Sequence, residues 1–230
     1  MLEAVDLSKK YDSTYALIDL NLSIKPGEVY CLLGQNGAGK TTTINLFLGI
    51  DMPTSGKALI NGVEVKRGNN TNQMIAYILE VVQLYGNMTG VENLDFFSKL
   101  SGFRHTKTAL VDLLNKAGLQ AIEHNKKLTA YSKGMRQKVG IAIALSKNAQ
   151  VILMDEPTSG LDPKATAEFT SICKELARDN KSILMATHDI FNAVNVGTKI
   201  GIMKEGKLIH ATKNNNISAN ELQELYLKTI

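Results

Sequence analysis

Long apolar runs are missing from this sequence. A membrane-crossing helix needs roughly 18–20 consecutive apolar residues, whereas the longest apolar stretches here are short ones such as Ile141–Leu145 and Val151–Met154. The chain is therefore predicted not to form a transmembrane pore by itself. The first residues also lack the basic start and the apolar stretch of a secretory signal, and this second absence predicts a cytoplasmic location.

Cysteine and histidine are scarce as well. The two cysteines, Cys31 and Cys173, lie in apolar or helical patterns, and disulfide frameworks need denser, closely spaced cysteines. The histidines are scattered and form no pair at the spacing of metal ligands; they are His105, His124, His188 and His210. The sequence therefore predicts two buried, reduced thiols and no structural metal site.

Neither sign of charge dominates the composition. The 230 residues include 26 Lys and Arg against 22 Asp and Glu, a formal net charge of +4, and no basic stripe is interleaved with aromatic residues. The charge balance thus favours neither a nucleic acid nor a lipid surface as partner. With 44% hydrophobic and 21% charged residues, the composition is that of a folded protein with a buried core.

The first third of the chain is rich in strand patterns. Alternating apolar and polar residues predict half-buried strands, and a continuous apolar run predicts a fully buried one, which a glycine-rich stretch joins to a helix. In chain order the predicted strands are Leu2–Lys9, Leu17–Ile24, Val29–Leu33, Lys57–Ile60 and Met74–Leu79, with the helix over Lys40–Leu48. The third strand and the helix form a strand–loop–helix unit.

The pattern becomes helical from about residue 84 to residue 145, which predicts an inserted helical subdomain. Its helices are expected at Val91–Leu100, Lys107–Ala117 and Gly134–Leu145. Strands and helices then alternate: Val151–Met154, Lys164–Asp179, Ser182–Ala186, a short helix after His188, Lys199–Met203, Lys207–His210 and Ala219–Lys228. Such alternation predicts an α/β fold with a parallel sheet covered on both faces.

The loop between the buried strand and the first helix carries the clearest chemical signal. It has the eight-residue phosphate-loop pattern and stands in the context that this pattern requires; its residues are Gly34, Gln35, Asn36, Gly37, Ala38, Gly39, Lys40 and Thr41. Glycines let backbone N–H groups turn toward phosphate, and the helix N-terminus adds partial positive charge. Lys40 can reach the outer phosphates, and Thr41 can ligate Mg²⁺. We expect nucleotide binding here, with Thr42 among the contacts.

A second chemical signal is the acidic end of the strand Val151–Met154. Asp155 and Glu156 follow it directly, and because strand side chains alternate, the two carboxylates are expected to point in different directions. Asp155 is placed to hold Mg²⁺ through water, and Glu156 to accept a proton from the water that attacks the γ-phosphate of the nucleotide.

Further motifs give a family resemblance. The stretch Tyr131–Gln137, Tyr-Ser-Lys-Gly-Met-Arg-Gln, resembles the signature motif of ATP-binding cassette (ABC) ATPases, and Asp155–Pro163 resembles the acidic motif of that family running into its D-loop. His188 resembles the switch histidine. The resemblance implies one nucleotide-binding domain over residues 1–230. This domain would hold a phosphate-loop α/β core, an N-terminal antiparallel β subdomain and a helical subdomain at about 84–145.

The resemblance also implies roles for single residues, and some have simpler alternatives. Ser132 and Gly134 would close over ATP held by a second cassette, although Ser132 alone is also a good helix N-cap. Asp162 would act across the same dimer. His188 would contact the γ-phosphate, or else cap or pack locally. Tyr11 would stack on adenine, or else be a half-buried strand residue.

Several positions depart from the family pattern, among them the stretch Asn195–Lys199, which lacks a usual acidic residue, and three residues of the nucleotide-site motifs. Glu80 stands where glutamine is usual, and still offers an oxygen ligand to Mg²⁺ and ATP. Lys133 replaces glycine and Met135 replaces glutamine in the signature. These departures resemble the cassettes of bacterial drug, antibiotic and polysaccharide exporters, and therefore favour export as the direction of transport.

Taken together, the resemblance implies the ATPase subunit of an ABC membrane transporter. It would bind ATP and Mg²⁺ at the cytoplasmic face of the membrane, dimerise head to tail and drive a separate transmembrane permease subunit. The complete motif set favours a homodimer. The segment Glu80–Asn93 would grip the permease with exposed apolar residues, expected to be Val81, Val82, Leu84 and Tyr85. Two alternatives stay open: a soluble ABC mechanoenzyme acting on nucleic acid or ribosomes, and a cassette that only binds ATP as a switch.

Overall fold

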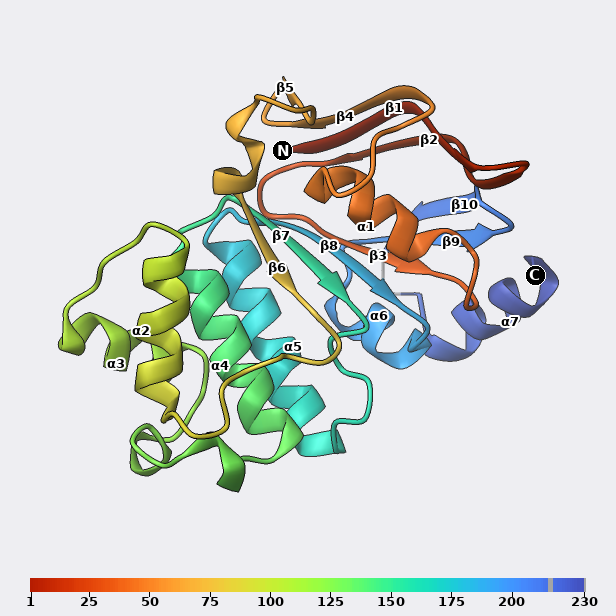
Figure 1. Ribbon diagram of the computed structural model, residues 1–230. Helices are drawn as coiled ribbons and strands as arrows, with labels where there is room; N and C mark the ends of the chain where they lie inside the picture. Colours follow the sequence, from red (N-terminus) through yellow and green to blue (C-terminus); the bar gives the residue numbers. More distant parts are fainter. Residues whose placement is uncertain (215–216, 230) are drawn as a thin grey trace.

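The computed structural model describes residues 1–214 and 217–229 and contains two sheets (Figure 1). The smaller sheet is antiparallel, with the strand order β2-β1-β4-β5. Its strands are β1 (Leu2–Tyr11), β2 (Thr14–Ile24), β4 (Ser55–Ile60) and β5 (Val63–Glu64). The antiparallel N-terminal sheet implied by the family resemblance is thus confirmed.

The larger sheet has six strands in the order β10-β9-β3-β8-β7-β6. All neighbours are parallel except β10, which pairs antiparallel with β9 at one edge. The strands are β3 (Val29–Leu33), β6 (Ile75–Ile78), β7 (Val151–Asp155), β8 (Ser182–Thr187), β9 (Lys199–Lys204) and β10 (Lys207–Lys213). The carboxyl ends of β3, β7 and β8 therefore lie at one edge, where chemistry gathers in open α/β sheets.

Seven α-helices and three short 3₁₀ turns are found in the described ranges. The helices are α1 (Lys40–Leu48), α2 (Gly90–Leu100), α3 (Lys107–Lys116), α4 (Lys133–Ser146), α5 (Pro163–Arg178), α6 (Ile190–Val196) and α7 (Ala219–Thr229). The 3₁₀ turns are η1 (Asn70–Met74), η2 (Ala121–Glu123) and η3 (Leu128–Ala130). No described helix is long and apolar enough to cross a bilayer.

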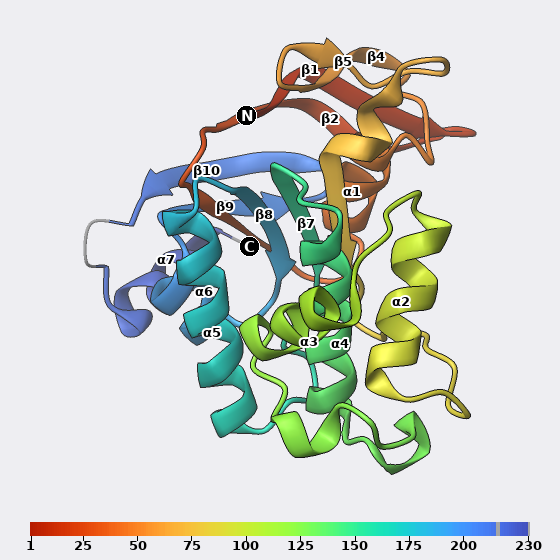
Figure 2. The same ribbon diagram turned by 90° about the vertical axis from the view of Figure 1, so that its left-hand side faces the viewer.

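Successive residues of β3 face two separate cores because strand side chains alternate. Cys31 and Leu33 pack with the helices of one face, whereas Tyr30 and Leu32 pack with α1 and the antiparallel sheet. Figure 2 shows α5 and α6 on one side of the large sheet and α1 beneath the small sheet on the other. The predicted parallel sheet covered on both faces is confirmed.

The helices between β6 and β7 lie side by side at one end of the molecule, with α2 and α3 packed on α4 (Figures 1 and 2). The predicted helices in this part are confirmed to within a residue at each end. The third of them, α4, begins one residue earlier than predicted, at Lys133 instead of Gly134. The helix begins early because Ser132 caps it, accepting a hydrogen bond from the Met135 amide at 3.3 Å.

Both cysteines are free and fully buried, as predicted. Burial disfavours the charged thiolate and raises the pKa of Cys31 to about 12. It raises the pKa of Cys173 as well. The two thiols are therefore inert core residues at neutral pH.

Candidate nucleotide-binding site

The glycine-rich loop joins β3 to α1 in a shape that only glycine accepts at two positions. Gly37 and Gly39 have φ angles of 83° and 104°, in the left-handed region that side chains disfavour. A Cβ on Gly39 would also lie 2.6 Å from the Ala16 carbonyl oxygen. Gly39 caps α1 without a side chain, so the first N–H groups of α1 are left for an external anion.

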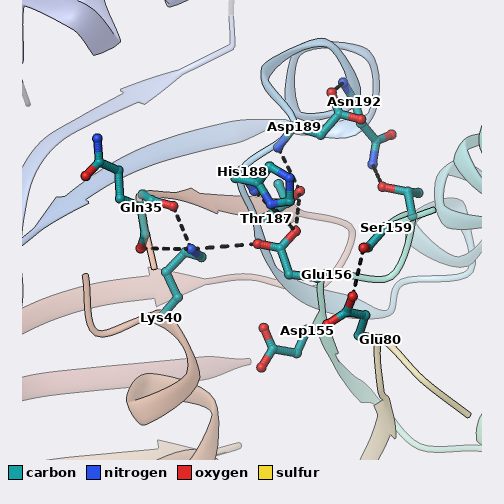
Figure 3. Close-up of polar contacts among 12 residues, drawn as sticks. Gln35, Lys40, Glu80, Asp155, Glu156, Ser159, Thr187, His188, Asp189 and Asn192 are labelled. Atoms are coloured by element: carbon teal, nitrogen blue, oxygen red, sulfur yellow. Dashed lines mark hydrogen bonds and ion pairs between the residues drawn. The ribbon is translucent and has the colours of Figure 1, made fainter. Parts of the chain in front are cut away.

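Lys40 folds back over this loop. Its ammonium donates to the carbonyl oxygens of Gly34 at 2.6 Å and Gln35 at 3.2 Å, and lies 3.7 Å from Glu156 Oε1 (Figure 3). The residue is only 5% exposed. A buried ammonium held by two carbonyls and one carboxylate is a fixed positive charge at the mouth of the loop, where phosphate oxygens would enter.

The two carboxylates after β7 point in different directions, as predicted, but not because of the strand pleat. β7 ends at Asp155, whose Oδ2 accepts a hydrogen bond from Thr41 Oγ1 at 2.9 Å. Glu156 has already left the strand, with φ 44°, and this left-handed turn aims its carboxylate away from Asp155. A strained backbone at such a position is typical of functional sites.

Glu156 is held from the β8 side by the residues that follow that strand. Its Oε2 lies 2.9 Å from His188 Nδ1 and accepts from the His188 amide and the Thr187 hydroxyl, both at 3.3 Å (Figure 3). Its Oε1 is buried and has no hydrogen-bond partner in the described chain. One oxygen is therefore oriented while the other is free to accept a proton.

Glu80 reaches the same site from the loop after β6. Ser159 Oγ donates to Glu80 Oε1 at 2.8 Å (Figure 3). Burial raises the pKa of Asp155, the hydrogen bond from Thr41 opposes that rise, and the charges of Glu156 and Glu80 add to it. The three carboxylates therefore give this side of the site a negative charge.

These side chains surround a cavity of about 640 Å³, large enough for a small-molecule ligand. The residues that line the cavity are Ala16, Gln35, Asn36, Gly37, Gly39, Lys40, Thr41, Thr42, Tyr77, Leu79, Glu80, Val81, Asp155 and Glu156. Gly34 and Ala38 lie in the same loop without lining the cavity. Thus one cavity is lined by most of the predicted phosphate-loop residues and by the predicted magnesium ligands Thr41, Asp155 and Glu80.

The donor set fits Mg²⁺ only in the presence of phosphate. Within residues 1–214 and 217–229 no group of three or more His, Cys, Asp or Glu side chains is placed to hold a metal ion. The oxygens of Thr41 and Asp155 are nevertheless hard ligands of the kind that Mg²⁺ prefers, and Mg²⁺ commonly takes one or two protein ligands with substrate phosphates and water. The residues present therefore fit a metal that arrives with a nucleotide.

Tyr11 lies at the end of β1 and does not line the cavity. Its ring is 41% exposed, with the Lys9 ammonium 4.8 Å from the ring centroid. Its hydroxyl donates to Asp51 at 2.5 Å. Partial burial and the Asp51 carboxylate raise the pKa of Tyr11 to about 12, whereas the nearby Thr42 hydroxyl lowers it. Tyr11 is thus a partly buried strand residue, as the alternative expected, and stacking on adenine stays a prediction.

Ser132, Gly134 and Asp162 are not brought to the cavity. They lie at the N-termini of α4 and α5, where Ser132 and Asp162 serve as N-caps. Asp162 Oδ1 accepts from the Ala165 amide at 2.8 Å, and both capping residues are exposed. Within this single chain their roles are structural, and any contact with nucleotide would have to come from a second cassette.

Two substitutions of Asp162 separate these roles. Asp162→Ala is expected to lower the free energy of unfolding by about 1 kcal/mol because it removes the cap, whereas Asp162→Asn keeps an accepting oxygen and nearly all of that stability. Urea denaturation without nucleotide measures both. If Asp162 acts across a dimer through its charge, Asp162→Asn weakens ATP-dependent dimerisation at unchanged stability. Full dimerisation of Asp162→Asn would limit Asp162 to capping.

Sequence reasoning missed the residues that support the site. Thr187 orients Glu156, and Asp189 caps α6 by accepting from the Asn192 amide at 3.0 Å. Asn192 in turn donates to Thr158 at 3.3 Å. Thr187 could have been found from the sequence, because it is a hydroxyl residue at the end of an apolar strand, directly before a histidine. Ser159 was also missed, since nothing local in the sequence shows that it lies against Glu80.

The predicted permease-contact segment is only partly exposed. Val81 and Tyr85 are 55% and 49% exposed, as expected. Val82 and Leu84 were expected to be exposed and are half-buried, because Val82 packs on Gly140 of α4 and Leu84 packs on the core. Tyr85 instead pairs with two aromatic residues of α2, with ring centroids 5.1 Å from Phe96 and 5.9 Å from Phe97.

The cavity combines a glycine loop that follows a strand, a buried lysine, and two carboxylates at the end of another strand. These features define a phosphate-loop nucleoside triphosphatase. The family model described as ABC transporter matches residues 17–159. The chain belongs to the ABC transporter family, as its ATP-binding ATPase component. Its predicted fold class and ATP as ligand are thereby confirmed.

Relatives of known name support this assignment. The bacitracin transport ATP-binding protein BcrA of Bacillus licheniformis is 38% identical over 211 residues, which cover 91% of this chain and 68% of that protein. The lantibiotic transport ATP-binding protein SrtF of Streptococcus pyogenes is 33% identical over 91% of this chain and 89% of its own length. The probable multidrug ABC transporter ATP-binding protein YbhF of Escherichia coli is 31% identical, but this chain spans only 39% of it.

Solved structures agree with the fold. A dimeric ATP-binding cassette, MJ0796, in a post-hydrolysis state with ADP and Pi has a TM-score of 0.83 at 28% identity, covering 94% of this chain and 100% of that one. The cbiO1 protein of Clostridium perfringens, part of the ABC transporter complex cbiONQ, has a TM-score of 0.85 at 28% identity. That match covers 99% of this chain and 94% of the cbiO1 chain.

Proposed function

We propose that this chain is the ATP-hydrolysing subunit of an ABC exporter, working at the cytoplasmic face of the membrane with a separate permease subunit. The observation that carries the proposal is the complete hydrolytic set around Glu156, which lies between Lys40 and His188. A cassette that only binds ATP would have no use for a free carboxylate oxygen at that point. Relatives named for bacitracin and lantibiotic transport support export as the direction.

ATP binding places the outer phosphates against the loop amides and Lys40, whose charge offsets the charge of the phosphates. Thr41 and Asp155, with Glu80 beside them, would hold a Mg²⁺ ion that arrives with the nucleotide, and the ion would supply positive charge to offset that of the phosphates. Glu156 orients the attacking water and takes its proton at Oε1, the oxygen without a partner. His188 fixes the other oxygen of Glu156 and faces the γ-phosphate.

A second cassette completes the site in this proposal. Ser132 and Gly134 lie outside the chain's own cavity, at the N-terminus of a 14-residue helix with unpaired amides. Facing the phosphates of a second copy, they would supply the donors that the open cavity lacks. Because this chain carries both halves of such a site, two copies suffice, and we propose a homodimer. The known dimeric cassette with ADP and Pi supports this arrangement.

The permease would dock on an apolar surface between the loop after β6 and helix α2. We define this docking patch as Val81, Tyr85 and Phe96, which are 55%, 49% and 38% exposed. Aromatic residues dominate the energetics of such contacts. The patch continues directly into Glu80, so a partner that moves it would also move a side chain of the nucleotide site.

The test is recovery of a partner. Tagged Glu156→Gln chain, purified from native membranes in mild detergent with ATP and Mg²⁺, is expected to bring down a multi-spanning protein in stoichiometric amount. The substitution slows turnover and so prolongs the ATP-bound state. Recovery from the soluble fraction alone, or with RNA, would overturn the transporter role and favour a soluble mechanoenzyme.

The docking patch has its own test in the same experiment. Changing Tyr85 and Phe96 together to serine should lower recovery of the membrane protein by more than about tenfold, because each truncates a candidate anchor residue. Leu227→Ser is the matched control, since Leu227 is 63% exposed on α7, away from the patch. Equal losses in both variants, with both folded by circular dichroism, would contradict the assignment of the patch.

A further inference from the structure

The loop Ser159–Asp162 follows the catalytic Glu156 and is contacted from two opposite sides. On one side Ser159 Oγ donates to Glu80 at 2.8 Å. On the other side the Lys133 side chain covers Gly160, where a Cβ would lie 3.1 Å from Lys133 Nζ. Glu80 and Lys133 are both positions at which this chain departs from the usual family pattern, and both side chains touch the same loop.

The charge of Lys133 is not explained by helix stability. Lys133 is the first residue of α4, where the helix dipole disfavours a cation. Its ammonium has no ion-pair partner in the part of the chain that the structure describes, although nine such pairs occur elsewhere in those residues. The packing over Gly160 gives this side chain a structural use.

The loop after β6, helix α4 and the loop Ser159–Asp162 all contact one another. The loop after β6 is fixed to α4, since Gln137 Nε2 donates to the Leu79 carbonyl at 3.2 Å and a Cβ on Gly140 would lie 2.9 Å from Val82. The first turn of α4 in turn packs on the loop and on the start of α5, since a Cβ on Gly134 would lie 3.8 Å from Leu161 Cδ2 and 3.3 Å from Ala165 Cβ. Figure 3 shows Ser159 and Glu80 meeting beside Asp155 and Glu156.

The first part of the loop, before Asp162, makes few backbone hydrogen bonds. Its own backbone hydrogen bonds in this turn are those of the Ser159 amide to Glu156 and the Leu161 amide to Thr158, both 3.1 Å. Gly160 is exposed, with φ 65°, and glycine adds flexibility. Asp162 fixes the end of the loop as the N-cap of α5, and side-chain contacts from outside the loop help to place Ser159 and Gly160.

We propose that Glu80 and Lys133 form a charged clamp that positions the loop Ser159–Asp162, and through it Glu156. Glu80 lies between Leu79, which is hydrogen-bonded to α4, and Val81 of the docking patch. A shift of the docking patch would therefore move Glu80 and, through the clamp, change the rate of hydrolysis. Glu80 and Lys133 act here as positioning residues. This inference deepens the proposed function and rests on it for its link to transport, but the clamp itself is a property of the single, nucleotide-free chain.

Amide hydrogen exchange of the nucleotide-free chain tests the clamp. Ser159→Ala and Lys133→Met should each speed exchange at the Leu161 amide by roughly threefold to tenfold, the effect of losing one modest contact. Ser171→Ala and Lys174→Met are the matched controls, because both residues are exposed on α5 and should leave that rate unchanged. Acceleration by only one of the two variants, or by neither, overturns the clamp. The result does not depend on whether the chain hydrolyses ATP or binds a permease.

Steady-state kinetics tests the positioning role. Neither Ser159 nor Lys133 lines the chain's own cavity, so both variants should lower kcat severalfold at unchanged KM for ATP, and Lys133→Arg should restore it. A rise in KM for Lys133→Met, with exchange at Leu161 unchanged, would instead show that Lys133 binds the nucleotide of a second cassette. That outcome would overturn the clamp and leave the ATPase function intact.

Discussion

Lys40→Ala is expected to abolish ATP binding at millimolar concentrations and to lower hydrolysis by roughly two to three orders of magnitude, the cost of removing one fixed electrostatic donor. The effect is large because Lys40 is only 5% exposed and its ammonium is held at 2.6 Å from the Gly34 carbonyl. The ammonium is thus already in position and loses little entropy when phosphate arrives.

Thermal melting with and without ATP measures this prediction. A ligand at 100 times its dissociation constant stabilises the native state by about 2.7 kcal/mol, so the wild-type chain should melt at a higher temperature with ATP. Lys40→Ala should show no such shift. Thr43→Ser in the same helix is the control, since Thr43 is buried and its hydroxyl bonds only the Gly39 carbonyl. A normal ATP-dependent shift in Lys40→Ala would remove Lys40 from the binding role.

Glu156→Gln is expected to lower kcat by about 10²- to 10⁴-fold, the range for loss of a general base, while ATP affinity is kept or increased. The amide has the same shape, but its oxygen is too weak a base to take the proton from water. Removing a negative charge 3.7 Å from Lys40 also leaves that ammonium freer for phosphate. The variant should therefore accumulate as an ATP-bound dimer.

Single-turnover hydrolysis and light scattering with ATP and Mg²⁺ measure the two effects separately. Asp189→Asn serves as the control, because Asp189 is a capping residue close to His188 and asparagine keeps the accepting oxygen. Unchanged hydrolysis by Glu156→Gln would show that another group acts as base. A loss of ATP affinity equal to the loss of turnover would show that the substitution disrupts the site as a whole.

Much of the fold follows from local patterns. Alternation of side chains along strands and the spacing of apolar residues along helices predict nearly every element, because each element buries one face or one stripe. The loop Gly34–Gly39 is predictable for the same local reason, since Gly37 and Gly39 adopt φ angles that other residues avoid. Asp155 could be placed near Thr41 in advance because parallel strands end at one edge of a sheet.

The exposed fractions of the residues in the predicted permease-contact segment could not be predicted from local patterns. Val82 and Leu84 have the same apolar character as Val81 and Tyr85, and nothing in the sequence separates the two pairs. Packing against α4 at Gly140 half-buries Val82, and packing on the core half-buries Leu84, whereas Val81 and Tyr85 stay exposed. Burial of a loop residue depends on what packs over it, and that neighbour is distant in the chain.

The sequence alone determined the phosphate loop, the acidic strand end and the order of strands and helices, because these depend on neighbouring residues and on backbone preferences. The tertiary structure decided which side chains meet. Ser159 bonds Glu80 across 79 positions of chain, Thr187 orients Glu156, and Lys133 covers Gly160. Contacts of this kind depend on how separate elements pack in three dimensions, and no local pattern of residues carries that information.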